Sequence, residues 1–123
     1  MFDDDDPLLN RVRNLCLAFP DAAEKISHGH PAFFTTKVFA YYGGSVKVDG
    51  RYQQHEHSLV VLLPPDEREA LLDQGRCYVP AYLGPSGWLG IDLDTDTDWQ
   101  EIGELLDASY RRTAGARRVA RLR

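Results

Sequence analysis

The sequence predicts an α+β fold, in which two amphipathic helices cover one face of an antiparallel β-sheet. Apolar residues recur at helical spacing near both ends of the chain: Leu8, Val12, Leu15 and Phe19, then Trp99, Ile102, Leu106 and Tyr110. Between these stripes lie short aromatic and β-branched runs with tight turns, which favour antiparallel strand pairing. Two helices cover only one face, so the other face should stay partly open, and a ligand or partner is expected there.

The first helix has a clear beginning and a clear end. Asp6 is a good N-cap residue, and Pro7 suits the first helical position. Pro20 should end the helix, because the residue before a proline disfavours helical backbone.

The middle of the chain is expected to be rich in strands. The candidate strands share aromatic or β-branched residues and cover residues 24–28, 32–36, 37–42 and 59–63. Turns between them are indicated by Gly29 with Pro31, by Gly43-Gly44 and by Asp49-Gly50.

A short helix, two strands and a long helix are expected in the second half. The short helix covers residues 67–74, and Gly75 should stop it. The strands cover residues 76–81 and 88–93, on either side of the turn at residues 84–87. The last helix begins at Asp98, with Glu101 placed as in a capping box, and should end or weaken at Gly115.

A single core is expected beneath one sheet face, with both long helices on that face. Its expected members combine large apolar side chains from the helices and strands: Phe19, Phe39, Trp88, Trp99, Ile102 and Leu106.

Length and charge indicate one acidic domain with a basic tail. The 123 residues fit a single domain, which we place at residues 1–112, followed by a basic, frayed tail at residues 113–123. Residues 1–110 carry a net charge of −11, whereas residues 111–123 hold six arginines and no acid. The acidic body disfavours general affinity for nucleic acid, but the tail can supply a local basic patch.

Motifs exclude several classes of protein. The sequence contains neither GxGxxG nor GxxxxGK[ST], and Trp88 replaces the last glycine of a GxSxG elbow. The aspartates at 94, 96 and 98 lack the glycine and glutamate of a calcium loop. We therefore expect no enzyme and no cofactor. The longest apolar run, residues 59–63, is too short to span a membrane, and the two cysteines suit a cytoplasmic protein.

All four histidines occur in two His-x-His pairs, His28 with His30 and His55 with His57. On a regular strand such residues share one side, so each pair has the spacing of a metal chelate. Nothing in the sequence brings the pairs together, so we expect turn-flanking or solvent-facing histidines and no metal site.

Several motifs together resemble the MmcQ/YjbR-like family, whose bacterial members often carry an SHGxPxF…GKxFA segment. They occur in family order as SHGHPAFF at 27–34, KVFA at 37–40, PP at 64–65, VPAYLG at 79–84, GWLGI at 87–91, DW at 98–99 and SYR at 109–111. The resemblance covers about residues 8–112. It implies a fold similar to bacterial frataxin, the CyaY-like fold, with a twisted antiparallel sheet packed against helices on one face.

The family is often described as DNA-binding, by structural analogy rather than visible chemistry. This chain departs from the family pattern at two places. Thr36 replaces the glycine before Lys37, and the strand at 59–63 is wholly apolar, where many relatives carry a lysine or a tryptophan-cysteine pair. Loss of that lysine weakens a phosphate-contact role for the strand.

Three functional hypotheses follow. The first is weak, salt-sensitive DNA binding without catalysis, with phosphate contacts from Lys37, Lys47, Arg51, Arg111 and Arg112. The second is a small-ligand or protein-interaction domain that uses a pocket on the open face near His28, Lys37, Tyr82 and Trp88. The third is metal handling by the acidic run at residues 3–6, which is explained more simply as a solvated helix start.

Overall fold

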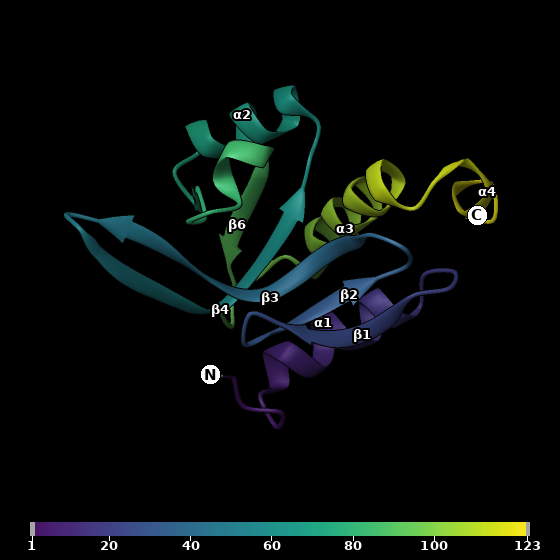
Figure 1. Cartoon of the computed structure of the whole chain (residues 1–123), viewed down its shortest axis with the longest axis horizontal. Helices are drawn as coiled ribbons and strands as arrows, with labels where there is room; N and C mark the ends of the chain where they lie inside the picture. The colour runs from purple at the N-terminus through teal and green to yellow at the C-terminus, as the bar shows by residue number, and fades with distance from the viewer. Residues whose placement is uncertain (1, 123) are drawn as a thin grey trace.

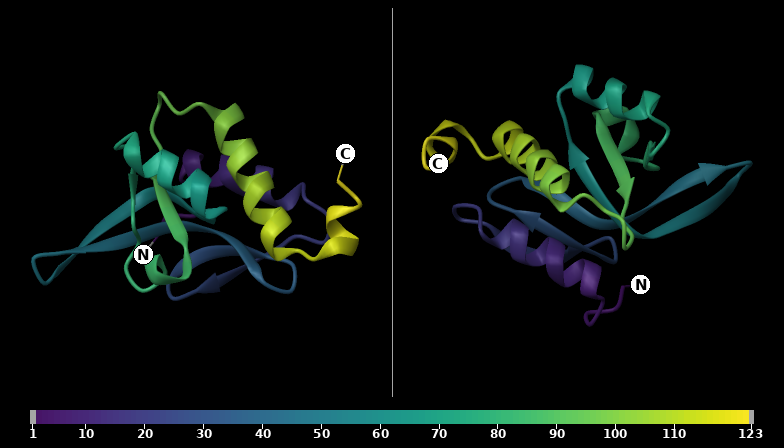
Figure 2. Two further views of the ribbon diagram at one scale, coloured as in Figure 1. Left: turned by 90° about the horizontal axis from the view of Figure 1, so that it is seen from above. Right: turned by 180° about the vertical axis from the view of Figure 1, so that it is seen from behind.

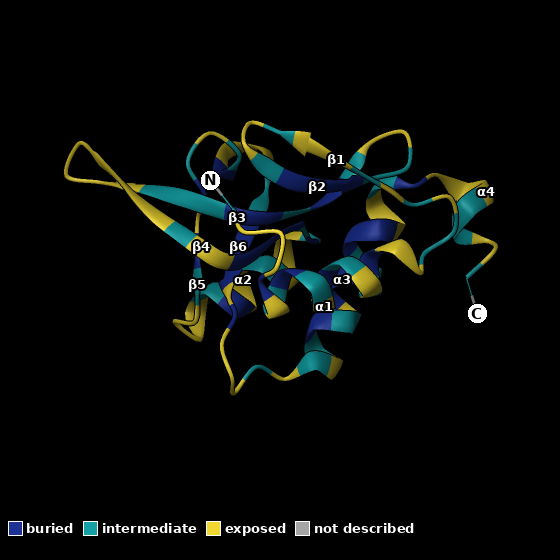
Figure 3. Cartoon of the chain, turned by 90° about the horizontal axis from the view of Figure 1, so that it is seen from below, coloured by how far each residue is buried: buried dark blue, intermediate teal, exposed yellow. Residues whose placement is uncertain are grey.

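The computed structural model describes residues 2–122 and has one open six-stranded sheet with its main helices on one side (Figures 1 and 3). The elements in chain order are α1 (Pro7–Leu17), β1 (Ala23–Ser27), β2 (His30–Phe34), β3 (Val38–Val48), β4 (Arg51–Leu62), α2 (Pro65–Asp73), β5 (Cys77–Tyr78), the 3-10 turn η1 (Gly84–Ser86), β6 (Trp88–Asp92), α3 (Trp99–Thr113) and α4 (Ala116–Val119). The strand order is β1-β2-β3-β4-β6-β5, and all neighbours are antiparallel. The predicted α+β class and sheet arrangement are confirmed.

The two long helices begin at the predicted caps. The Asp6 carboxylate accepts a hydrogen bond from the Leu8 N–H at 3.0 Å, and Asp98 accepts from the N–H groups of Gln100 and Glu101. Glu101 does not complete a capping box with its side chain, because that carboxylate pairs with Arg76 at 3.1 Å.

Strands β3 and β4 form a long hairpin whose outer half projects from the body as an arm (Figure 1). Asp49 and Gly50 both have positive φ, 51° and 79°, as a two-residue hairpin turn requires. The expected strands at 37–42 and 59–63 were therefore too short. Both faces of the arm are largely exposed to solvent. Its sequence therefore does not alternate between apolar and polar residues.

Gly43-Gly44 was predicted to be a turn, and this prediction was wrong. Both glycines lie inside β3, where neighbouring side chains occupy the space above them. A Cβ atom on Gly43 would lie 2.8 Å from the Nδ1 atom of His30, and one on Gly44 would lie 2.5 Å from the Tyr78 hydroxyl. Glycine here serves close packing rather than reversal of the chain.

Two irregularities break the sheet register. Phe39 is an extra residue in β3, between the pairs Phe33–Ala40 and Phe34–Val38. Further along, three residues of β4 lie opposite the single Gly43, between the pairs Tyr42–Leu59 and Gly44–His55. At each break, regular alternation is lost, so side chains beyond it lie on the opposite face from the one that regular spacing predicts.

The core lies between the sheet and the helices, and most of the predicted members belong to it. Phe39, Ile102 and Leu106 are fully buried there, while Phe19 and Trp99 pack against them from partly exposed positions. The Phe19 ring stacks on Tyr110, with centroids 4.7 Å apart.

Trp88 was wrongly assigned to this core. Its neighbour Leu89 pairs with Val61 on the helix-covered face, so the alternation of β6 places Trp88 on the opposite face. There its ring meets Tyr41 edge-on, with centroids 5.3 Å apart.

The expected strand at 76–81 is reduced to Cys77–Tyr78. Pro80 cannot donate a hydrogen bond to a ladder, and the chain instead continues into a loop and η1. Past α3, the short helix α4 packs beside Asp21, and Arg123 of the predicted tail lies outside the described residues.

Candidate functional sites

The face of the sheet away from the helices has its own layer of side chains. Register places Ala32, Tyr41 and Val60 on this face, and Trp88 packs against Tyr41. The Tyr78 ring covers Gly90, where a Cβ atom would collide with it. Burial raises the pKa of Tyr78 to about 12, and its hydroxyl lies 2.7 Å from Ser58 Oγ.

A cavity of about 540 Å³ opens on this face, at the base of the hairpin arm. Four segments form it: the turn between β1 and β2, the middle of β3, Val60 of β4, and the loop before η1. Its lining residues are Ser27, His28, His30, Tyr41, Gly43, Gly44, Ser45, Val60, Pro80, Ala81, Tyr82 and Leu83. We call it the open-face cavity.

Two lining residues of the open-face cavity have unusual backbone conformations. His28 and Tyr82 have φ values of 53° and 67°, in the left-handed region that non-glycine residues seldom adopt. His28 and Gly29 form the two-residue turn that joins β1 to β2, whereas Tyr82 lies in the loop before η1. The Ala81 N–H donates to the Ser45 carbonyl at 2.8 Å and fixes the loop to β3. The Tyr82 ring, 81% exposed, stacks on Tyr52 of the arm, and their hydroxyls are hydrogen-bonded.

His30 lies deeper in the wall of the open-face cavity. Burial lowers its pKa, against the opposing effect of a hydrogen bond to the Tyr42 backbone, so its imidazole is neutral at neutral pH and has one ring nitrogen left for a further partner. No Lys, Arg, Asp or Glu occurs among the described lining residues of this cavity. The site therefore combines aromatic surface with neutral hydrogen-bonding groups.

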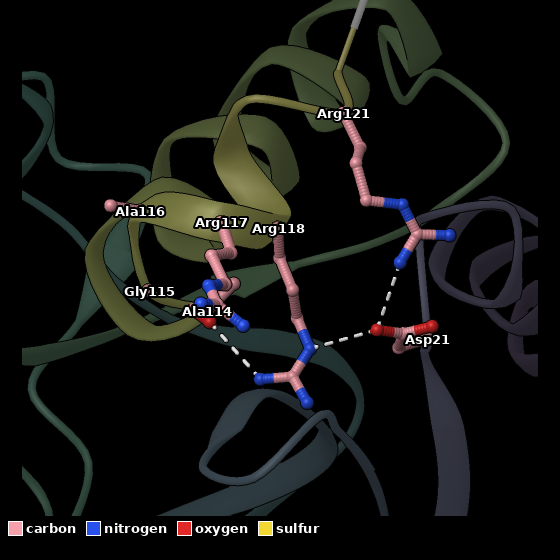
Figure 4. A pocket seen from close by; sticks show the side chains of 7 residues that line it. All are labelled: Asp21, Ala114, Gly115, Ala116, Arg117, Arg118 and Arg121. Atoms are coloured by element: carbon pink, nitrogen blue, oxygen red, sulfur yellow. Dashed lines mark hydrogen bonds and ion pairs between the residues drawn. The ribbon is translucent and has the colours of Figure 1, made fainter.

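A second hollow, of about 570 Å³, lies at the C-terminal end of the chain (Figure 4). Its lining includes Arg117, Arg118 and Arg121, with Asp21 as the one acid among the described lining residues. Arg118 Nε and Arg121 donate to the same Asp21 oxygen, at 3.1 and 3.0 Å, and these bonds lower the pKa of Asp21. Three guanidinium groups against one carboxylate leave a positive excess.

Arg118 also joins this hollow to the turn between β2 and β3, because it donates to Thr36 Oγ1 at 3.3 Å. Lys37 is the next residue of that turn. Arg112 is exposed in the last turn of α3, which leads directly into the hollow. We call this region, consisting of Lys37, Arg112, Arg117, Arg118 and Arg121, the arginine end.

The two His-x-His pairs occupy separate environments. The three-residue irregularity in β4 breaks the strand alternation, so His55 and His57 do not share a face. His55 stacks on Tyr78 of the open face and bonds Asp92 at 2.7 Å, whereas His57 turns toward Asp6 beneath the sheet. Among residues 2–122, no three His, Cys, Asp or Glu side chains are grouped to hold a metal ion.

Asp6, Tyr42 and His57 form a polar cluster that fixes the start of α1 to the sheet. The Tyr42 hydroxyl donates to the Asp6 carboxylate, and His57 Nδ1 lies 2.9 Å from the same oxygen. Burial alone would raise the pKa of Asp6, but the hydrogen bonds from Tyr42, the Leu8 N–H and His57 outweigh it and hold that pKa below its ordinary value. Since Asp6 is also the N-cap of α1, anchoring the helix accounts for the cluster.

The predicted phosphate-contacting residues fall into two separate groups. Arg112 belongs to the arginine end and follows Arg111, which pairs with Asp107 at 2.7 Å, while Lys37 follows Thr36, the residue that Arg118 contacts. Lys47 and Arg51 lie near the tip of the hairpin arm, at the opposite end of the molecule from the C-terminus (Figure 2). The five predicted phosphate-contacting residues therefore do not form one continuous surface.

The predicted pocket residues are also only partly brought together. His28 and Tyr82 line the open-face cavity, and Trp88 packs against the lining residue Tyr41. Lys37 precedes the first residue of β3, whereas Gly43–Ser45 lie in the middle of that strand, and Lys37 does not line the cavity. The sequence did not predict Ser45 or Val60 as lining residues. The Gly43-Gly44 pair was a signal in the sequence that side chains from other segments pack closely against β3 at this point.

Comparison with known proteins decides the family. The family model described as YjbR matches residues 17–112, which is most of the chain. The chain belongs to the YjbR family. YjbR is not a known enzyme family, and no curated protein matches this chain.

A solved structure supports the same fold for this YjbR-family chain. The crystal structure of the Deinococcus radiodurans protein DR2400, with a DUF419 domain, is similar with a TM-score of 0.57 and 18% sequence identity. The match covers 83% of this chain and 75% of that chain, and at this identity it supports the fold alone. Within residues 2–122, no helix has the length and apolar character needed to cross a membrane.

Proposed function

We propose that this YjbR-family protein binds DNA without catalysing a reaction, and that the arginine end contacts the phosphate backbone. The observation that carries the proposal is the group of Arg117, Arg118 and Arg121 around one hollow, in a chain whose first 110 residues are acidic. Arg118 also contacts Thr36, the residue before Lys37. Phosphate attraction depends on basic charge presented locally. Binding elsewhere on the acidic body is disfavoured.

The arginine side chains of the arginine end can exchange their carboxylate partner for another anion. Arg121 and Asp21 are both about half exposed, and exposed ion pairs contribute little to stability. A DNA phosphate can therefore replace the Asp21 carboxylate as the partner of Arg118 or Arg121 at small cost. Arginine also binds phosphate oxygens with two parallel N–H groups.

The proposal predicts weak, salt-sensitive and sequence-tolerant binding. Each neutralised phosphate of duplex DNA contributes about 0.9 to the slope of log affinity against log salt. Three or four contacts give a slope of roughly −3 to −4. Phosphate contacts carry no direct sequence information, so unrelated duplexes should bind similarly.

Fluorescence anisotropy with labelled duplex and single-stranded oligonucleotides, at several salt concentrations, tests the proposal. The double variant Arg117→Gln/Arg121→Gln should make the slope shallower by about two units. The matched control Lys47→Gln/Arg51→Gln removes the same charge from the hairpin arm and should leave the slope unchanged. Asp21→Asn should strengthen binding, because it removes the competing carboxylate.

Two results would refute the proposal. One is the absence of binding at low salt. The other is a slope that responds to the arm control but not to the arginine double variant, which would move the contacts to the hairpin.

A further inference from the structure

The open-face cavity has features of a binding site that DNA contact at the arginine end does not require. Its volume of about 540 Å³ falls within the range of roughly 300–1,000 Å³ for small-molecule sites. It lies at the junction of four chain segments, and β3 and β4 of the sheet contribute to its lining.

The chemistry of the cavity wall restricts the ligand. Tyr41 and Tyr82 provide aromatic rings, while His28, His30, Ser27 and Ser45 provide hydrogen-bonding groups. Because no described lining residue is Lys, Arg, Asp or Glu, a charged group inside the cavity would lose its hydration without gaining an ion pair from the wall. Lys47 lies outside the wall, over the Tyr52 ring. An uncharged ligand with a flat aromatic ring and a polar edge matches these walls.

The backbone holds the polar and aromatic groups at the cavity rather than leaving them free. Tyr82 adopts a left-handed conformation in a loop, outside any hairpin turn, and such backbone outliers cluster at binding sites. Tyr82 remains 81% exposed although its loop is bonded to Ser45 and its ring is stacked on Tyr52. An ordered, exposed aromatic ring at the rim is suited to stack on a ligand.

We propose that the open-face cavity binds a neutral, planar heteroaromatic small molecule of about nucleoside size. The ring stacks against a cavity tyrosine, and its polar edge exchanges hydrogen bonds with the imidazoles of His28 and His30. In its neutral state, His30 uses one ring nitrogen for the Tyr42 backbone and leaves the other as a hydrogen-bond acceptor for the ligand. This site is separate from the arginine end and does not depend on DNA binding.

NMR titration of the full chain tests the proposal with three probes: adenosine as a neutral heteroaromatic, benzoate as an anionic aromatic, and glucose as a neutral non-aromatic. Adenosine should shift the amide signals of Gly43, Gly44, Ser45 and Ala81 and should bind more tightly than the other two. Its affinity should not depend on salt, which separates it from the phosphate contacts of the proposed function.

Two variants and one control locate the site. Tyr82→Ser should weaken adenosine binding at least fivefold, since its exposed ring packs into no core. His28→Gly should also weaken it, while glycine suits the positive φ at that position. The control Val48→Ser lies on the arm outside the cavity and should leave binding unchanged.

The proposal is overturned if adenosine causes no shifts at millimolar concentration, if benzoate or glucose binds as tightly, or if Tyr82→Ser binds adenosine like the unmodified chain. Failure of DNA binding in the anisotropy assay leaves these expectations unchanged.

Discussion

Ser109 of α3 donates a hydrogen bond to the carbonyl of Phe39, seventy positions earlier in the chain, at 2.6 Å. Phe39 is the extra residue of the β3 bulge, so its carbonyl is displaced from the regular ladder. The same hydroxyl accepts from the Leu62 N–H at 2.9 Å. One side chain thus satisfies a backbone group of each central strand and fixes α3 over the bulge.

Replacing Ser109 with alanine should lower the free energy of unfolding by about 1–3 kcal/mol, because the Phe39 carbonyl and Leu62 N–H lose their partner. Urea denaturation measures the change. Thr113→Ala is the control, since that hydroxyl bonds only carbonyls of its own helix. Equal losses for the two variants would contradict the bridging role.

The Asp6 cluster predicts a loss of stability in acid. The pKa of Asp6 is lower in the folded protein than its ordinary value. The carboxylate therefore contributes stability that is complete above its unfolded pKa of about 3.9, and this contribution is lost as the pH falls through the folded-state pKa.

The test compares the chain with Asp6→Asn in denaturant titrations between pH 6 and pH 2. The unmodified chain should be more stable at pH 6, and the difference should shrink below about pH 4. Tyr42→Phe keeps the carboxylate but removes one hydrogen bond, so it should show a smaller difference. A gap between the chain and Asp6→Asn that is constant with pH would exclude an ionised Asp6 anchor.

Gly90 and Gly103 should respond to alanine in opposite directions. A Cβ atom on Gly90 would collide with the buried Tyr78 ring, so Gly90→Ala should destabilise the fold by about 1–3 kcal/mol. Gly103 lies in α3 with no neighbouring atom within 4 Å of a new Cβ, so Gly103→Ala should stabilise it by about 0.5–1 kcal/mol. Thermal melts of the two variants should move to opposite sides of the unmodified chain.

Truncation of Leu106 should lower the free energy of unfolding more than truncation of Trp99, although tryptophan is the larger side chain. Leu106 is fully buried, so Leu106→Ala should cost about 2–5 kcal/mol. Trp99 is partly exposed and has the Arg11 guanidinium 4.6 Å from its ring, so Trp99→Ala should cost less than Leu106→Ala. Denaturant melts of both variants check the order, and a larger loss for Trp99 would show that its ring is a main core contact.

Local signals in the sequence were sufficient for the helices and for the general fold. Asp6, Pro7 and Asp98 mark helix starts through chemistry that depends on the nearest few residues. The arm was missed because residues 53–56 are polar and gain their strand structure from pairing across the Asp49-Gly50 turn.

The candidate sites depended on features that local patterns do not encode. The placement of Trp88, and of His55 opposite to His57, follows from sheet register and its irregularities. The open-face cavity needs Gly43 inside a strand beside His30, a contact between segments thirteen residues apart. In the sequence, Arg118 and Arg121 are only part of a basic tail. Their shared ion-pair partner, Asp21, is about 100 positions away and could not be predicted from local spacing.

The placement of the basic residues at one end gives the molecule an electric dipole moment. The aspartates of residues 3–6 precede or begin α1 near the N-terminus, while the C-terminal arginines follow α3, and Figure 1 shows the N-terminus and α4 well apart. In the field of any polyanion this dipole produces a torque that turns the arginine end forward before contact occurs. Added salt should therefore slow the approach to a polyanion by removing this orientation, as well as loosen the final contacts.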